Sequence, residues 1–230
     1  MPPLDRLRRK YPWPAQRPAV APSDRGWDCG GRELVTAALA ARSARIVLEI
    51  GSFVGLSART WLRAAPAATV ICVDPWPDVD VRDWGIRDWP ELAGQSLYDV
   101  FLSGCWPYRD RVIPVRGGSP GALEEIHAVG VRPDLVYIDG DHSHDAVWGD
   151  LWFCSRLFPN AVLCGDDWTW TGKHFPPKSV REAVLEFAAS EGGRVEASGN
   201  TWVLHRSPPP LRRVGRWLQS FFRRTVRRAG

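Results

Sequence analysis

The stretch Val136–Trp168 constrains the fold of this 230-residue chain more than any other. An apolar run, Leu135–Ile138, ends abruptly at the polar residues Asp139–His142. A segment whose apolar residues recur at helical spacing follows, and a second apolar run, Ala161–Cys164, then ends at Asp166–Trp168. This order predicts a strand, a helix and a second strand, and such a crossover makes the two strands parallel.

Acidic residues follow both of these strands at their carboxyl ends, where open α/β sheets bind their ligands. Asp139, Asp166 and Asp167 are therefore expected to converge, and three carboxylates repel one another unless a cation lies between them. An all-oxygen set favours Mg²⁺ before Ca²⁺ or Mn²⁺ and disfavours Zn²⁺. His142, at the same edge, is the expected general base. The alternative is ordinary helix-cap and Asp-Gly turn chemistry with a solvent-exposed histidine.

A glycine loop precedes this unit in the sequence. The short apolar run Ile46–Ile50 predicts a buried strand, the loop covers Gly51–Gly55, and Leu56–Ala64 has the pattern of a helix. A glycine loop between a strand and a helix lets the backbone approach a ligand, to which the helix N-terminus offers unpaired amides. Many strand–helix turns also need a glycine without binding anything, so the loop alone does not decide.

The next predicted strand, Thr69–Val73, ends at Asp74. An acid at this place can bind the ribose hydroxyls of either NAD or S-adenosylmethionine. The phosphate-binding pattern G-x-G-x-x-G is absent, because the loop places three residues, among them the bulky Phe53, between its two glycines. Glu49, just before the loop, would repel a pyrophosphate but suits a ligand with an amino group and a sulfonium. The pattern favours S-adenosylmethionine over NAD.

Two further segments each allow two interpretations. Pro75–Gln95 is an irregular insertion with three tryptophans, which either form a lid or acceptor wall or pack the insertion onto the body. Ser119 either lies near an adenine or caps a helix that has Pro120 at its first position. The rest of the chain predicts helices and strands in the following order: helix Arg32–Ala41, helix Leu92–Leu102, strand Val112–Val115, helix Val180–Phe187, and a hairpin of Arg194–Ala197 and Thr201–His205.

Composition and charge divide the chain into three parts. Residues 1–26 are rich in proline and predict a poorly ordered lead-in, residues 27–206 the main domain, and residues 207–230 a basic tail. The net charge is +4, yet Arg206–Gly230 contains eight arginines and no acid, so the rest is near −4, which argues against a nucleic-acid partner. Cysteines without a C-x-x-C pair, no long apolar span and no secretory signal predict a cytoplasmic protein.

These motifs carry a resemblance to a known family. From about Arg32 to His205 the chain resembles class I S-adenosylmethionine-dependent methyltransferases. Its loop VLEIGSFVGLSA is similar to the first motif of metal-dependent O-methyltransferases, although Phe53 stands where a third glycine is usual. VYIDGDHSHDAVWGDL and VLCGDDW resemble the family of sugar, rhamnosyl and macrolide O-methyltransferases and cephalosporin-hydroxylase-like proteins. The implied fold is α/β and Rossmann-like: a mostly parallel seven-stranded sheet with a closing antiparallel hairpin and helices on both faces.

The resemblance also implies roles for individual residues. Asp139, Asp166 and Asp167 would hold Mg²⁺, and His142 would be the catalytic base. The implied cofactor-binding residues lie on the loop, at the strand ends and after the third strand: Glu49, Gly51, Ser52, Gly55, Ser57, Asp74, Ser119 and Asp139. From their position alone, on the loop after the acidic pair, Trp168 and His174 are expected to wall the acceptor pocket.

The predicted activity is Mg²⁺-dependent methylation of a hydroxyl on a sugar, a glycolipid or another small polyol or natural product. A bound metal lowers the pKa of a hydroxyl, and a nearby histidine can remove its proton. Two alternatives stay open: a protein that binds S-adenosylmethionine without turnover, and an NAD-dependent oxidoreductase. Association with a second copy of the chain is also left open.

The basic tail suggests a location for the enzyme. After three prolines, Leu211–Arg228 places apolar and aromatic residues at helical spacing with arginines opposite them. This composition is typical of an in-plane helix on an anionic membrane, which would place the enzyme at the inner membrane surface. The alternative is that the apolar side docks on the protein's own body or on a second subunit.

Overall fold

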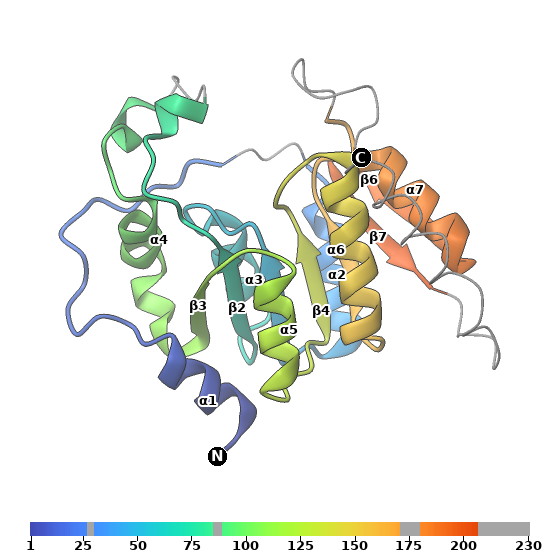
Figure 1. Ribbon diagram of the computed structural model, residues 1–230, viewed down its shortest axis with the longest axis horizontal. Helices are drawn as coiled ribbons and strands as arrows, with labels where there is room; N and C mark the ends of the chain where they lie inside the picture. Colours follow the sequence, from blue (N-terminus) through green and yellow to red (C-terminus); the bar gives the residue numbers. More distant parts are fainter. Residues whose placement is uncertain (27–29, 85–88, 171–179, 207–230) are drawn as a thin grey trace, which may run out of the picture.

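The computed structural model describes residues 1–26, 30–84, 89–170 and 180–206. Within these residues the chain forms a seven-stranded sheet in the order β3-β2-β1-β4-β5-β7-β6 (Figure 1). The strands are β1 (Ile46–Ile50), β2 (Thr69–Asp74), β3 (Val112–Arg116), β4 (Leu135–Ile138), β5 (Val162–Gly165), β6 (Arg194–Ser198) and β7 (Thr201–His205).

Strand direction divides the sheet into two parts. The strands β3, β2, β1, β4 and β5 are parallel to one another. Strand β7 runs antiparallel to β5, and β6 runs antiparallel to β7, so the hairpin closes one edge. All five parallel strands therefore end at one edge of the sheet. The predicted fold class is confirmed.

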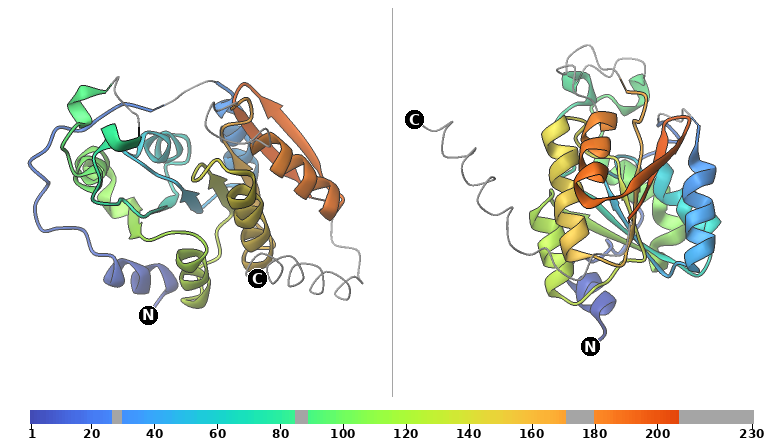
Figure 2. Two further views of the ribbon diagram at one scale, coloured as in Figure 1. Left: turned by 45° about the horizontal axis from the view of Figure 1, so that its top comes forward. Right: turned by 90° about the vertical axis from the view of Figure 1, so that its right-hand side faces the viewer.

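Helices cover both faces of the sheet, as the views in Figure 2 show. Helices α2, α3 and α4 pack on one face through residues such as Trp61 and Phe101. Helices α1, α5, α6 and α7 pack on the other through residues such as Leu123, Leu151 and Phe187. The helices are α1 (Pro3–Lys10), α2 (Arg32–Arg42), α3 (Leu56–Ala64), α4 (Leu97–Cys105), α5 (Gly121–Ala128), α6 (His144–Leu157) and α7 (Val180–Glu191), with short 3-10 helices η1 (Val81–Trp84), η2 (Pro90–Leu92) and η3 (Trp106–Arg111).

The N-terminal segment corrects one prediction, because residues 1–26 are not a poorly ordered lead-in. Helix α1 buries Leu7 completely in the core. The Tyr11 hydroxyl donates a hydrogen bond to Glu125 at 2.9 Å, and the indole of Trp13 donates to the carbonyl of Val112 at 2.9 Å. Single apolar residues hold this segment, and isolated residues of that kind produce no periodic pattern in the sequence.

The helix predicted at Leu92–Leu102 is displaced in the structure. The 3-10 helix η2 comes first, and α4 begins only at Leu97. The Ser96 hydroxyl accepts a hydrogen bond from the backbone N–H of Asp99 at 3.2 Å. Ser96 is thus the N-cap, a start signal that the apolar pattern alone misses.

No helix in the part of the chain that the structure describes is both long enough and apolar enough to cross a bilayer. The predicted amphipathic tail, Leu211–Arg228, lies outside the described residues.

Candidate active site

A cavity of about 760 Å³ opens at the carboxyl ends of the parallel strands. It brings together residues that lie far apart in the sequence, on the glycine loop and after β2, β3, β4 and β5. The predicted site residues that line it are Gly51, Ser52, Ser57, Asp74, Ser119, Asp139, His142, Asp166 and Asp167. Glu49 and Gly55 are not among its lining residues.

Both glycines of the loop are required by the packing of the chain itself. Gly51 has a φ of +84°, and a Cβ at this position would lie 2.0 Å from the carbonyl oxygen of Asp139. Gly55 has a φ of +80°, and its Cβ would lie 2.7 Å from the Cys105 sulfur. Gly51 therefore lets the loop after β1 approach the chain after β4. Gly55 serves the contact with α4 and not the cavity.

Glu49 supports the loop from below. Its side chain is fully buried. Ser52 Oγ donates a hydrogen bond to Glu49 Oε2 at 2.6 Å, and the indole N–H of Trp61 donates one to Oε1 at 3.1 Å. Burial raises the pKa of Glu49, and the hydrogen bonds from Ser52, Ser57 and Trp61 oppose that rise. Its effect on a ligand is indirect, through Ser52, which does line the cavity.

Asp74 ends β2 with its carboxylate fixed in orientation. Its Oδ2 accepts a hydrogen bond from the backbone N–H of Phe53 at 2.9 Å, and its Oδ1 accepts one from that of Trp76 at 2.7 Å. Burial raises the pKa of Asp74, against the lowering effect of these N–H groups. The carboxylate is therefore held at the cavity wall by the protein alone.

The tryptophans of the insertion pack onto the body. Trp76 is buried, donates from its indole N–H to the carbonyl of Phe53 at 2.7 Å and lies against Phe101, with ring centroids 4.6 Å apart. Trp89 is 9% exposed and contacts the Phe53 ring, with centroids 6.0 Å apart. For these two residues the packing interpretation is correct.

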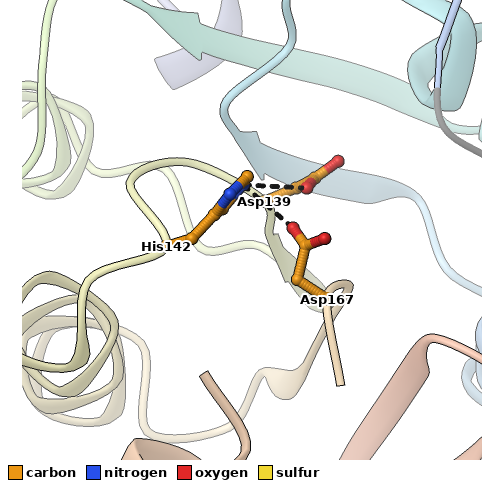
Figure 3. A group of neighbouring side chains, drawn as sticks. All are labelled: Asp139, His142 and Asp167. Carbon is orange, nitrogen blue, oxygen red and sulfur yellow. Dashed lines mark ion pairs between the residues drawn. The ribbon is translucent and has the colours of Figure 1, made fainter. Parts of the chain in front are cut away.

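The ends of β4 and β5 bring an acidic cluster together around one histidine. His142 Nε2 lies 2.9 Å from Asp167 Oδ2 and 4.0 Å from Asp139 Oδ1. Figure 3 shows the imidazole turned toward both carboxylates. One candidate ligand atom from each residue lies within 4.8 Å of the others. Of the three predicted carboxylates, Asp139 and Asp167 come together in this group, and His142 is its third member. Asp166 is not in the group, although it lines the same cavity.

The charges in this cluster perturb one another. Burial and the neighbouring Asp167 and Asp166 carboxylates raise the pKa of Asp139 well above its usual range. Burial and the charge of Asp167 raise the pKa of Asp166 to about 6. Burial lowers the pKa of His142, but its hydrogen bond to Asp167 and the nearby acidic charges outweigh this and leave it raised. The carboxylates thus repel one another, and a cation between them would reduce that repulsion.

The donor set fits a bound divalent cation. Two carboxylates and an imidazole meet at the cavity, and Asp166 Oδ1 is buried without a well-aligned hydrogen bond among the described residues. Carboxylate oxygens are the ligands of hard ions such as Mg²⁺. An unsatisfied buried carboxylate oxygen is costly, and a ligand would offset that cost.

Comparison with known proteins identifies the family. The family model described as a methyltransferase domain matches residues 48–168, which is more than half of the chain. The chain belongs to this methyltransferase family. The predicted class, an S-adenosylmethionine-dependent methyltransferase, is confirmed. No curated protein matches the sequence significantly.

Solved structures resemble the methyltransferase in fold. An O-methyltransferase from Bacillus cereus in complex with S-adenosylhomocysteine has a TM-score of 0.53 at 16% identity, covering 89% of this chain and 90% of that one. TomG from Streptomyces achromogenes, involved in tomaymycin synthesis and solved with S-adenosylmethionine, has a TM-score of 0.51 at 17% identity, covering 90% and 91%. S-adenosylhomocysteine-bound PaMTH1 from Podospora anserina has a TM-score of 0.51 at 16% identity, covering 76% and 77%.

Asp150 is a cavity residue of the methyltransferase that sequence reasoning missed. It lies on α6, where the Ser119 hydroxyl donates a hydrogen bond to its Oδ1. Burial raises the pKa of Asp150 to about 6. Ser119 is not the cap of α5, because that helix begins at Gly121 after Pro120 and has no side-chain cap. The only sequence signal for Asp150 was an acidic residue on the apolar face of the predicted helix.

The N-terminal segment also reaches the cavity, where Arg25 and Gly26 line it. The guanidinium of the buried Arg59 donates to the carbonyl of Ser23 at 2.7 Å and pairs with Asp24 at 2.8 Å. These contacts were missed because residues 1–26 were expected to lack order.

The predicted acceptor wall is different in the structure. Trp168 contacts the Arg181 guanidinium, 5.3 Å from its ring centroid, and does not line the cavity. Trp170 does line it, at 37% exposure, with its ring centroid 5.4 Å from that of His142. His174 lies outside the described residues.

Proposed function

We propose that this methyltransferase transfers a methyl group from S-adenosylmethionine to a hydroxyl oxygen of a small-molecule acceptor. A divalent cation assists the reaction, and Mg²⁺ is the first candidate. A sugar, a glycolipid or another small polyol is the proposed acceptor class. The observation that carries the proposal is one cavity lined by both Asp74 and the cluster of Asp139, His142 and Asp167. The O-methyltransferases with a similar fold support the reaction type.

The cofactor is proposed to bind along the glycine loop and β2. The fixed carboxylate of Asp74 would accept hydrogen bonds from the ribose hydroxyls. Backbone amides at the start of α3 would face the amino-acid part of the cofactor. Ser119 and Asp150 line the same cavity and would lie toward the adenine.

Asp139 and Asp167 would hold the cation, with Asp166 as the third carboxylate. A bound cation supplies Lewis acidity, which lowers the pKa of a hydroxyl beside it. His142 would be the base that takes the hydroxyl proton. The oxygen lone pair freed in this way would form the new C–O bond as the C–S bond of the sulfonium breaks, with the neutral thioether S-adenosylhomocysteine as the leaving group. General base catalysis of this kind contributes about 10²–10⁴-fold. Trp170, exposed beside His142, would contact the acceptor.

A binding screen tests the proposal against its two alternatives. We expect S-adenosylmethionine and S-adenosylhomocysteine to raise the melting temperature of the purified chain and NAD to leave it unchanged. Tight NAD binding without S-adenosylhomocysteine binding would overturn the proposal in favour of an oxidoreductase. Cofactor binding without methyl transfer, across a panel of sugars and polyols with Mg²⁺, would identify a non-catalytic binding protein.

We also propose that the basic tail holds a cytoplasmic enzyme at the inner membrane surface, an inference from the sequence of residues 211–228 alone. Each arginine near an anionic leaflet contributes about 1 kcal/mol. Co-sedimentation with anionic liposomes should pellet the full chain but not a chain ending at His205. Equal pelleting of the two, or none by either at low salt, would show that the tail docks elsewhere.

A further inference from the structure

Asn200 lies in the turn of the β6–β7 hairpin and is pinned there by its own backbone. It is 5% exposed. Its N–H donates to the carbonyl of Gly30 at 3.1 Å, and its carbonyl accepts from the N–H of Trp168 at 2.8 Å. The backbone of Asn200 is thus tied both to the chain before α2 and to the loop after β5.

The side-chain amide of Asn200 connects that loop to the acidic cluster. Its Oδ1 accepts hydrogen bonds from the N–H of Thr169 at 2.9 Å and from the Thr169 hydroxyl at 2.6 Å. Because a backbone N–H can only donate, the oxygen of the amide must face Thr169. The Nδ2 group therefore faces Asp167, and it donates to Oδ1 at 3.3 Å.

This contact sets the direction of the Asp167 carboxylate. Asp167 has a φ of +62°, a left-handed conformation that costs free energy for a residue with a side chain. Asn200 takes its Oδ1, and Oδ2 is left to face His142 at 2.9 Å. The side-chain bond from Asn200 to Asp167 and its bonds to the backbone N–H groups of residues 168 and 169 hold the strained loop in the conformation that presents Oδ2 to the cluster.

We propose that Asn200 is a positioning residue, which orients Asp167 toward the cation and toward His142. This inference rests on the proposed metal-dependent function. The hairpin turn does not itself require asparagine at position 200, because the turn residue with a positive φ is Gly199, at +53°. Hydrogen-bond partners of ligating carboxylates fix their orientation, and their loss weakens metal affinity or activity by about 10–100-fold.

The experiment measures binding of Mn²⁺, a hard cation with the same ligand preference, by titration calorimetry of the full chain with S-adenosylhomocysteine bound. We expect Asn200→Ala to weaken Mn²⁺ binding by about 10–100-fold and to leave the affinity for S-adenosylhomocysteine unchanged. Asn200→Ser, which keeps a small polar side chain in the turn, gives the same comparison in case the alanine variant does not fold.

Two control variants separate the Asp167 contact from the turn and the loop. Thr169→Val removes a hydroxyl bonded to Asn200 but keeps the Asn200–Asp167 bond. Ser198→Ala removes the hairpin's hydrogen bond to Glu33. Both should bind Mn²⁺ like the wild type. In an Asp167→Asn background, Asn200→Ala should cause little further loss, because residues that act through one another are not additive.

Each remaining outcome decides between the two proposals. Wild-type Mn²⁺ affinity in Asn200→Ala, or the same loss in the Asp167→Asn background, would overturn the role of Asn200. A wild-type chain that binds S-adenosylhomocysteine but no Mn²⁺ would overturn the metal site and this inference with it, while the cofactor site stands. Absence of S-adenosylhomocysteine binding would overturn the proposed function itself.

Discussion

The two halves of the cavity treat their carboxylates differently. At the end of β2, both oxygens of Asp74 accept hydrogen bonds from backbone N–H groups, and Glu49 below the loop is bonded by Ser52 and Trp61. At the ends of β4 and β5, Asp139 and Asp167 both lie close to the same nitrogen, Nε2 of His142. Asp166 Oδ1 is buried without a well-aligned hydrogen bond among the described residues.

The difference indicates which half is complete before a ligand arrives. Donors from the protein bond to the acids of the β2 half, so that half, the proposed cofactor site, is organised before a ligand binds. The acids of the β4–β5 half repel one another, and a cation would remove that repulsion. Substitutions in the two halves should therefore have different effects. Those in the β4–β5 half should abolish turnover and leave cofactor affinity unchanged, and those in the β2 half should lower cofactor affinity.

Removal of charge from the acidic half should have the largest effect. Asp139→Asn with Asp167→Asn, or chelation by EDTA, is expected to lower methyl transfer by about a thousandfold or more, because the Lewis acid contributes several kcal/mol. Calorimetry should show that S-adenosylhomocysteine binding persists. Asp145→Asn, an exposed acid on the rim of the same cavity, is the control. Full activity in EDTA would contradict the metal-dependent mechanism.

Loss of the base should come next. We expect His142→Ala to lower kcat by about a hundredfold or more, the low end for a general base. His144→Ala is the matched control, because His144 lies two residues away and bonds to Glu186 on α7 at 3.0 Å. Rates measured with saturating cofactor and cation decide the question. Equal rates for the two histidine variants would show that His142 does not act as the base.

A substitution in the preorganised half should act on binding. Asp74→Ala is expected to lower the affinity for S-adenosylhomocysteine by about 10–100-fold, since hydrogen bonds to a charged group contribute about 1.5–3 kcal/mol. Asp78→Ala, an exposed acid paired with Arg116, should leave the affinity unchanged. An unchanged affinity in Asp74→Ala would show that the ribose does not bind at β2, and the contrast between the two halves would then be wrong.

The sequence predicts those parts of the site that follow from strand ends. Asp74 and Asp139 come directly after an apolar run and Asp167 follows one within three residues, and parallel strands bring such residues to one edge. Asp150 and Asn200 reach the same cavity for other reasons, namely the rotation of α6 about its axis and the docking of a hairpin. A contact of that kind depends on residues 31 and 33 positions away. No local pattern contains that information.

The N-terminal segment was mispredicted for a related reason. Its order comes from single contacts, such as Leu7 in the core and Trp13 on the carbonyl of Val112, and not from a repeating apolar face. Periodicity detects helices that bury a stripe, and it gives no signal for a chain held by isolated anchors.

Asp150 offers the smallest effect, and it tests whether part of the cofactor wall is held at a cost to stability. Burial raises its pKa to about 6, so folding disfavours its charged form. This unfavourable contribution is fully present above pH 6 and disappears as the pH falls through the folded value toward that of the unfolded chain.

Asp150→Asn removes the charge and keeps an oxygen that can accept from Ser119. At pH 8 we expect it to raise the free energy of unfolding of the ligand-free chain by about 1–2 kcal/mol, or the melting temperature by about 2–6 °C. At pH 5 the difference from wild type should fall to about half, and at pH 4, near the ordinary pKa of an aspartate in the unfolded chain, it should largely vanish. Asp145→Asn, on the same helix but exposed, should show no such pH-dependent gain. A lower melting temperature for Asp150→Asn at pH 8, or a difference independent of pH, would show that the Asp150 carboxylate is satisfied in the folded chain, and the β2 half would then extend as far as α6.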